Sequence, residues 1–106
     1  MKLGGIEAGG TKMVCAIGDE QGNIFDRVVF PTETPDITVP KMIDYFRDKG
    51  IEALGIGCFG PVDLNRKSPT YGYITSTPKL AWRFYDFAGA FREALQIPVG
   101  FDTDVN

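Results

Sequence analysis

The sequence contains no histidine among its 106 residues and has two cysteines, Cys15 and Cys58. The lack of histidine excludes a Ser-His-Asp triad and any histidine-ligated metal site within this stretch. Two cysteines without a histidine are also too few for a structural zinc site. Both cysteines lie in apolar segments, which predicts buried thiols, and a disulfide between them is the less favoured alternative.

The sequence also has no excess of positive charge and no long apolar run. Lys and Arg number 11 against 14 Asp and Glu, which gives a net charge of −3. Sequence-independent binding to nucleic acid needs a basic face, so we expect no nucleic-acid partner. No apolar run is long enough to span a bilayer, and no signal peptide precedes the first strand. We therefore expect a single globular domain in the cytoplasm, with no membrane partner.

The first third of the chain reads as an antiparallel meander. Apolar segments predict strands at 3–7, 13–17 and 24–30. The links between them are short, and the turn over 19–23 has a glycine at a plausible left-handed position. After residue 30 the spacing of the apolar residues changes from that of strands to that of helices, and two apolar stripes with helical spacing follow. Their members are Val39, Met42, Ile43 and Phe46 in the first, and Phe84, Phe87, Ala88, Phe91 and Leu95 in the second.

Local signals set the expected ends of these helices. We expect Thr38 as the N-cap of the first helix, Pro40 in its first turn and Gly50 as its terminator. Pro98 ends the second helix. A short hairpin is expected around residues 71–75, within an otherwise irregular segment.

Further strands are expected at 51–59 and 99–101. Helical crossovers make the first strand and these two parallel, with right-handed connections. The predicted fold class is therefore α/β: a mixed five-stranded sheet, three antiparallel strands and then parallel ones, with helices packed on it. Because these three strands are parallel, the loops that follow them converge on one edge of the sheet. Ligands in such sheets bind at this edge, beyond the carboxyl ends of the parallel strands.

The loop after the first strand has the composition of a phosphate site. Gly9 and Gly10 let backbone N–H groups approach an anion, Thr11 can donate a hydrogen bond, and Lys12 brings a positive charge. Glu7 offers a carboxylate to a hydrated magnesium ion. The loop matches neither a Walker A loop nor the dinucleotide glycine pattern, and a plain hairpin turn remains the alternative.

The last loop could supply the base for phosphoryl transfer, which needs placed phosphates, magnesium and a proton acceptor. Asp104 is the candidate, at the expected entry to a helix that begins near Asn106. Asp102 and Asp104 could instead serve as helix caps. Asp63 could simply order its loop, and Trp82 reads as a core residue rather than a ligand platform.

Together these loops resemble the N-terminal part of the ROK family of sugar kinases and repressors, and most of all its bacterial fructokinase branch. The resemblance covers essentially the whole chain, in order and spacing. It is carried by residues 5–12, 55–57, 59–63 and 75–79, by Trp82, and by residues 103–106.

The resemblance implies an actin-like ATPase fold, with two ribonuclease-H-like domains and the site between them. Residues 1–106 would form the N-terminal domain, and the second domain is not part of this sequence. Gly9, Gly10, Thr11 and Lys12 would form the first phosphate loop for ATP. Glu7 would help to hold Mg²⁺ through water.

For the sugar, the resemblance implies that Asp104 takes the proton from the reacting hydroxyl. Gly60, Pro61, Thr103 and Asn106 would border the pocket. Most of the family has Asp at the position of Glu7, and many members have Asn at that of Thr103. Both departures resemble the fructokinase branch and favour fructose over glucose, mannose or N-acetylmannosamine as the hexose.

The family's second phosphate loop, adenosine pocket and structural zinc site lie outside this sequence. We therefore expect the chain alone to be inactive and the full-length protein to be a homodimeric kinase. Two rivals remain. A repressor of the family would need a helix-turn-helix ahead of the phosphate loop, where this sequence leaves no room. The second rival is a non-catalytic interaction or sugar-sensing module with an actin-like fold, and Asp104 together with Glu7 argues against it.

Overall fold

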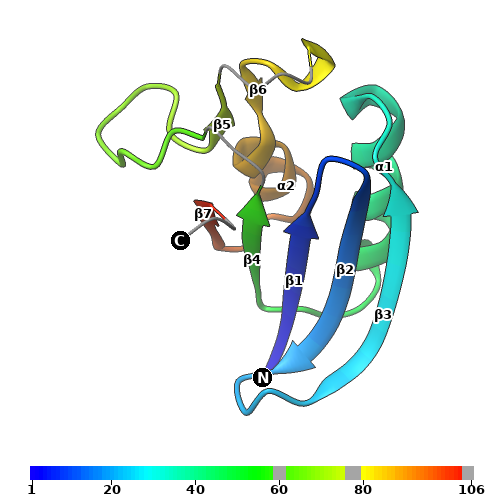
Figure 1. Ribbon diagram of the computed structural model, residues 1–106. Coiled ribbons are helices and arrows are strands. Elements are labelled where there is room, and N and C mark those ends of the chain that lie inside the picture. Colours follow the sequence, from blue (N-terminus) through cyan, green and yellow to red (C-terminus); the bar gives the residue numbers. More distant parts are fainter. Residues whose placement is uncertain (59–61, 76–79, 104–106) are drawn as a thin grey trace.

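The computed structural model describes residues 1–58, 62–75 and 80–103, with the backbone alone at Asp102 and Thr103. No helix in these ranges is long and apolar enough to cross a membrane. The elements, shown in Figure 1, are β1 (Lys2–Ala8), β2 (Lys12–Asp19), β3 (Ile24–Pro31), α1 (Pro35–Arg47), β4 (Ala53–Cys58), β5 (Tyr73–Ile74), η1 (Leu80–Trp82), β6 (Tyr85–Asp86), α2 (Phe87–Leu95) and β7 (Val99–Thr103).

The main sheet has the strand order β3-β2-β1-β4-β7. Strands β1, β2 and β3 pair antiparallel, whereas β4 pairs parallel with both β1 and β7. This arrangement confirms the predicted mixed sheet. Figure 1 shows α1 and α2 on the same side of it, as two successive right-handed crossovers in one direction require.

One face of the sheet therefore carries the core. Along β1, the side chains of Ile6 and Ala8 are buried and that of Glu7 between them is exposed. The same alternation in β4 buries Leu54 and Ile56 beneath the helices. The opposite face has no helix over it in the described part of the chain, and it is the face on which Glu7 lies.

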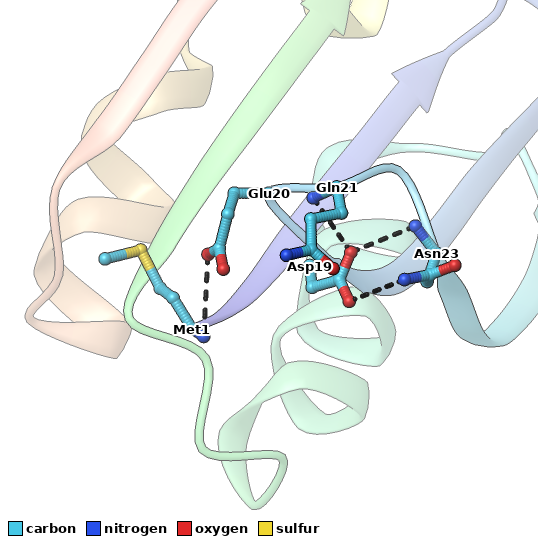
Figure 2. A network of polar contacts seen from close by, with 5 residues as sticks. All are labelled: Met1, Asp19, Glu20, Gln21 and Asn23. Atoms are coloured by element: carbon cyan, nitrogen blue, oxygen red, sulfur yellow. Dashed lines mark hydrogen bonds and ion pairs between the residues drawn. The ribbon is translucent and has the colours of Figure 1, made fainter.

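The turn between β2 and β3 is built around Asp19 (Figure 2). Its carboxylate accepts hydrogen bonds from the N–H groups of Gln21 at 2.9 Å and Asn23 at 3.0 Å, and from Asn23 Nδ2 at 2.9 Å. These bonds, above all those from Asn23, hold the pKa of Asp19 below its usual value. Gly22 adopts a φ of 88°, which confirms the predicted left-handed glycine.

Helix α1 begins one turn earlier than its apolar stripe predicts. The prediction of Thr38 as N-cap is wrong, because Thr34 occupies the N-cap position, without a side-chain capping bond, and Pro35 opens the helix with its fixed φ. Pro40 consequently lies inside the helix rather than in its first turn. Thr38 is fully buried, and its hydroxyl accepts a hydrogen bond from the N–H of Glu33 at 2.9 Å. The stripe marked the buried face of the helix, not its start.

Helix α2 begins at Phe87, so including Phe84 in its stripe is wrong. Phe84 has a φ of 58° and is 64% exposed. Asp86 is the N-cap, and its carboxylate accepts a hydrogen bond from the N–H of Gly89 at 2.9 Å. The left-handed residue Gln96 then ends the helix, just ahead of Pro98.

The predicted hairpin around residues 71–75 is also wrong. The partners of this segment lie outside it: strand β5 pairs antiparallel with β6, and Ile74 also forms an isolated antiparallel bridge to Val62. A two-residue strand is too short to show a period, so the sequence offers no signal for its distant partner.

Both cysteines are buried thiols, as predicted, and no disulfide joins them. Burial raises the pKa of Cys15 to about 12. Because the thiolate is the reactive form, we expect neither thiol to react with Ellman's reagent at pH 8 in the native chain. Both should react once guanidinium unfolds it. Fast labelling without denaturant would contradict the burial of that cysteine.

Candidate active site

The three parallel strands end side by side. The register pairs Ala8 with Cys58, and Cys58 with Thr103, so the last residues of β1, β4 and β7 form one row. With strands about 4.8 Å apart, the ends of β1 and β7 are separated by roughly 10 Å. The predicted convergence of the strand ends on one edge is therefore confirmed (Figure 1).

The loop between β1 and β2 is a tight hairpin of Gly9, Gly10 and Thr11. The N–H of Gly9 donates to the carbonyl of Lys12 at 2.9 Å. A Cβ on Gly9 would lie 2.9 Å from that same oxygen, closer than side-chain atoms normally approach, so the turn requires glycine there. Within the described residues, the N–H groups of Gly10 and Thr11 have no protein acceptor. Both are available to an anion.

The side chains of Thr11 and Lys12 are exposed at this hairpin. In the part of the chain that the structure describes, Lys12 forms no ion pair. An exposed ammonium group beside two available N–H groups is suited to binding phosphate oxygens. This arrangement favours a phosphate site over a purely structural turn.

Thr32, just after β3, holds the hairpin from the side. Its hydroxyl donates to the carbonyl of Gly9 at 2.8 Å, and its N–H donates to the carbonyl of Thr11 at 3.0 Å. Sequence reasoning missed this residue because it lies 23 positions from Gly9 and belongs to no motif. Only the pairing of β2 with β3 brings the two together.

Glu7 lies on the uncovered face of β1, where it lines a shallow depression together with Val14, Ala16 and Arg27. The register aligns Glu7 with Gly57 and Gly57 with Asp102. Two acidic residues thus occupy one row, with a glycine between them that contributes no side chain. Within the described ranges, no three acidic or cysteine side chains gather into a metal-binding group.

Asp63 orders the loop that follows residues 59–61. Its carboxylate accepts hydrogen bonds from the hydroxyls of Ser68 and Thr70, both at 2.6 Å, and from the N–H of Asn65 at 2.9 Å. These bonds, with that of Ser68 the largest cause, hold the pKa of Asp63 below its usual value. The main chain of Asp63 also bonds to Gly72 and Tyr73. The expectation that Asp63 orders its loop is confirmed.

Trp82 is a core residue, as predicted, with 1% of its surface exposed. Its ring stacks on Phe87 with centroids 5.6 Å apart. Its indole N–H donates to the carbonyl of Glu33 at 2.8 Å. The dipeptide Thr32-Glu33 therefore contacts the glycine hairpin on one side and η1 on the other.

Comparison with known proteins agrees with this geometry. Residues 3–106 match the profile of the ROK family. The chain belongs to the ROK family. It is 54% identical over 103 residues to a fructokinase of Lactococcus lactis subsp. cremoris and 50% identical over 105 residues to one of Streptococcus mutans. Each alignment covers 97% of this chain but 36% of the relative, so the chain spans about a third of their length.

Solved structures of ROK proteins share the fold. A ROK family protein from Streptococcus pneumoniae, solved in complex with sucrose, matches with a TM-score of 0.80 at 19% identity, over 98% of this chain and 35% of that one. A ROK family glucokinase from Streptomyces griseus, solved with glucose and AMPPNP, matches with a TM-score of 0.73 at 24% identity, over 100% and 34%. These matches confirm the predicted α/β, actin-like fold class.

The remaining predicted site residues of this ROK domain belong to the end of β7 and to the segments that follow β4 and β7. Gly60, Pro61, Asp104 and Asn106 lie outside the described residues. Thr103 is the last residue of β7 and stands in the row of strand ends beside Cys58. The structure thus brings together the glycine hairpin, Glu7 and the strand ends after which the predicted sugar-binding residues follow in the sequence.

Proposed function

We propose that this chain is the N-terminal domain of an ATP-dependent hexose kinase that transfers the γ-phosphate of ATP to a sugar hydroxyl. The observation that carries the proposal is the glycine hairpin with two available N–H groups at the edge where the three parallel strands end. ROK relatives named fructokinase, at 50% identity and above, support the same reaction.

On the nucleotide side, the N–H groups of Gly10 and Thr11 bind phosphate oxygens, and Lys12 neutralises part of their charge. The Thr11 hydroxyl adds a further donor, and Gly9 allows the close approach. Glu7 fits a role beside magnesium, because hydrated Mg²⁺ takes one or two carboxylates together with substrate phosphates. Mg²⁺, when bound, would offset the negative charge of the phosphates.

On the sugar side, Asp104 accepts the proton of the attacking hydroxyl, while Gly60, Pro61, Thr103 and Asn106 border the hexose. These roles come from the family resemblance. The register supports them by placing Thr103 in one row with Ala8, so that Asp104 follows directly from a strand end near the hairpin.

Fructose is the proposed hexose, because Glu7 and Thr103 follow the fructokinase branch of the family and the relatives bear that name. Glucose, mannose and N-acetylmannosamine are the alternatives. We further propose that the full-length protein is a cytoplasmic homodimer whose second domain carries the structural zinc. A non-catalytic sugar-sensing module is the alternative function, since a ROK transcriptional regulator shares the fold, with a TM-score of 0.75 at 13% identity.

A coupled assay of ADP release tests the reaction. We expect the full-length protein to turn over fructose with MgATP faster than the other three hexoses. Residues 1–106 alone should show no turnover, because the family's second phosphate loop and adenosine pocket are not in this chain. Calorimetric sugar binding by the full-length protein without any turnover would favour the sensing module. Substantial turnover by residues 1–106 would refute the division into two domains.

A further inference from the structure

We propose that Thr32 is a positioning residue for the phosphate hairpin, and that its hydroxyl sets the direction of the Gly10 N–H. The inference rests on the proposed function. The carbonyl of Gly9 and the N–H of Gly10 belong to one peptide unit, which is planar and trans. In such a unit the carbonyl and the N–H point in opposite directions. A hydrogen bond that fixes the carbonyl therefore fixes the N–H as well.

This peptide unit needs such a constraint because glycine stands on both sides of it. Glycine reaches positive and negative φ with similar ease, so the unit between Gly9 and Gly10 could rotate at little steric cost. The hydroxyl of Thr32 contacts the Gly9 carbonyl at 2.8 Å and selects one of these orientations. The bond also polarises the peptide unit, which makes the N–H a better donor to an anion.

Thr32 is itself held in place, so its hydroxyl is a fixed reference point. It lies between Pro31, which ends β3, and the cap of α1. Its own N–H donates to Thr11 at 3.0 Å. The next residue, Glu33, bonds through its N–H to the buried hydroxyl of Thr38 and through its carbonyl to Trp82. The core thus fixes the segment that orients the hairpin.

The test compares Thr32→Val, Thr32→Ser and Thr34→Val in the full-length protein. Valine keeps the shape and the main-chain bond of Thr32 but removes the donor, whereas serine keeps the donor. Thr34→Val is the matched control, because the Thr34 side chain makes no capping hydrogen bond. Without the hydroxyl of Thr32, the peptide unit between Gly9 and Gly10 can rotate, so that the Gly10 N–H no longer points at the phosphate. We therefore expect Thr32→Val to lower kcat/KM for MgATP about ten- to hundredfold, as misplacing a catalytic group by about 1 Å can do.

The expected pattern separates positioning from general damage. Thr32→Ser and Thr34→Val should stay within about threefold of the wild type, and hexose affinity measured by calorimetry should not change in any of the three variants. An equal loss for hexose and MgATP would overturn the proposal, as would kcat/KM for MgATP within about twofold of the wild type in Thr32→Val. If Thr32→Val does not fold, Thr32→Ala takes its place with the same expectations.

Failure of the proposed function gives a different result. A wild-type protein that phosphorylates no hexose refutes the kinase assignment. MgATP binding by calorimetry then decides the role of Thr32: about tenfold weaker binding to Thr32→Val than to Thr34→Val supports positioning. Equal binding to both variants overturns it, and so does a wild-type protein that binds no MgATP.

Discussion

Replacing Asp104 by asparagine in the full-length protein is expected to lower kcat by about 10²- to 10⁴-fold, which is the usual contribution of a general base, the role proposed for this residue. Asparagine has nearly the same shape as aspartate, but its amide does not accept the hydroxyl proton. The loss corresponds to roughly 3–5 kcal/mol of transition-state stabilisation at 1.36 kcal/mol per decade. The sugar should still bind, because the proton moves only during the reaction. Steady-state kinetics and calorimetric titration with fructose measure the two effects separately.

A second aspartate makes the experiment sharper. Asp102 stands two strands from Glu7 in the same row of the sheet, and Asp104 follows two residues later, beyond the end of β7. Asp102→Asn should therefore be measured beside Asp104→Asn, and the larger fall in kcat identifies the base. Asp44→Asn is the control, because its side chain is exposed on α1, away from the row of strand ends.

The outcome also separates the two candidate functions. A kinase requires a carboxylate base at Asp104, whereas a sensing module would only bind the sugar and would need no base. Turnover that does not change in Asp104→Asn would remove this residue from the mechanism. Loss of sugar binding together with turnover would show that Asp104 acts in binding rather than as the base.

The sheet and its functional edge could be predicted because the signals for them are local. Short links between apolar segments dictate antiparallel pairing, and a helical stripe between two strands dictates a parallel crossover. The end of each parallel strand then marks the edge. For this reason the sequence was sufficient to place the glycine hairpin after β1 at the same edge as the ends of β4 and β7.

The connections that hold this edge in place could not be predicted, because they join residues far apart in the chain. Thr32 reaches Gly9 across 23 positions, and Trp82 reaches Glu33 across 49. Both involve main-chain carbonyls, which every residue has, so side-chain identity does not reveal them. Phe84 illustrates the reverse case: its spacing fits the α2 stripe, but its left-handed backbone lies outside the helix.

A cluster of aromatic side chains on the buried side of α2 contributes to the stability of the domain and also supports the elements next to the candidate site. Phe87 is fully buried between Trp82 and Phe91, with ring centroids 5.6 and 5.5 Å away and small interplanar angles. Phe101 of β7 lies 6.4 Å away. Stacked aromatic pairs contribute beyond their buried area. Phe87 therefore supports both the strand that leads to Asp104 and the indole that is bonded to Glu33.

Phe87→Ala is expected to destabilise residues 1–106 by about 3–5 kcal/mol, because it removes buried surface and leaves a cavity. A domain of this size is typically stable by only about 5–15 kcal/mol, so the loss is a large share of the total. Phe84→Ala is the matched control: this side chain is 64% exposed, and the change should stay within about 0.5 kcal/mol. Urea unfolding followed by circular dichroism measures both. A loss below about 1 kcal/mol for Phe87→Ala would mean that the cluster repacks around the cavity, and that the support of Trp82 does not depend on this ring.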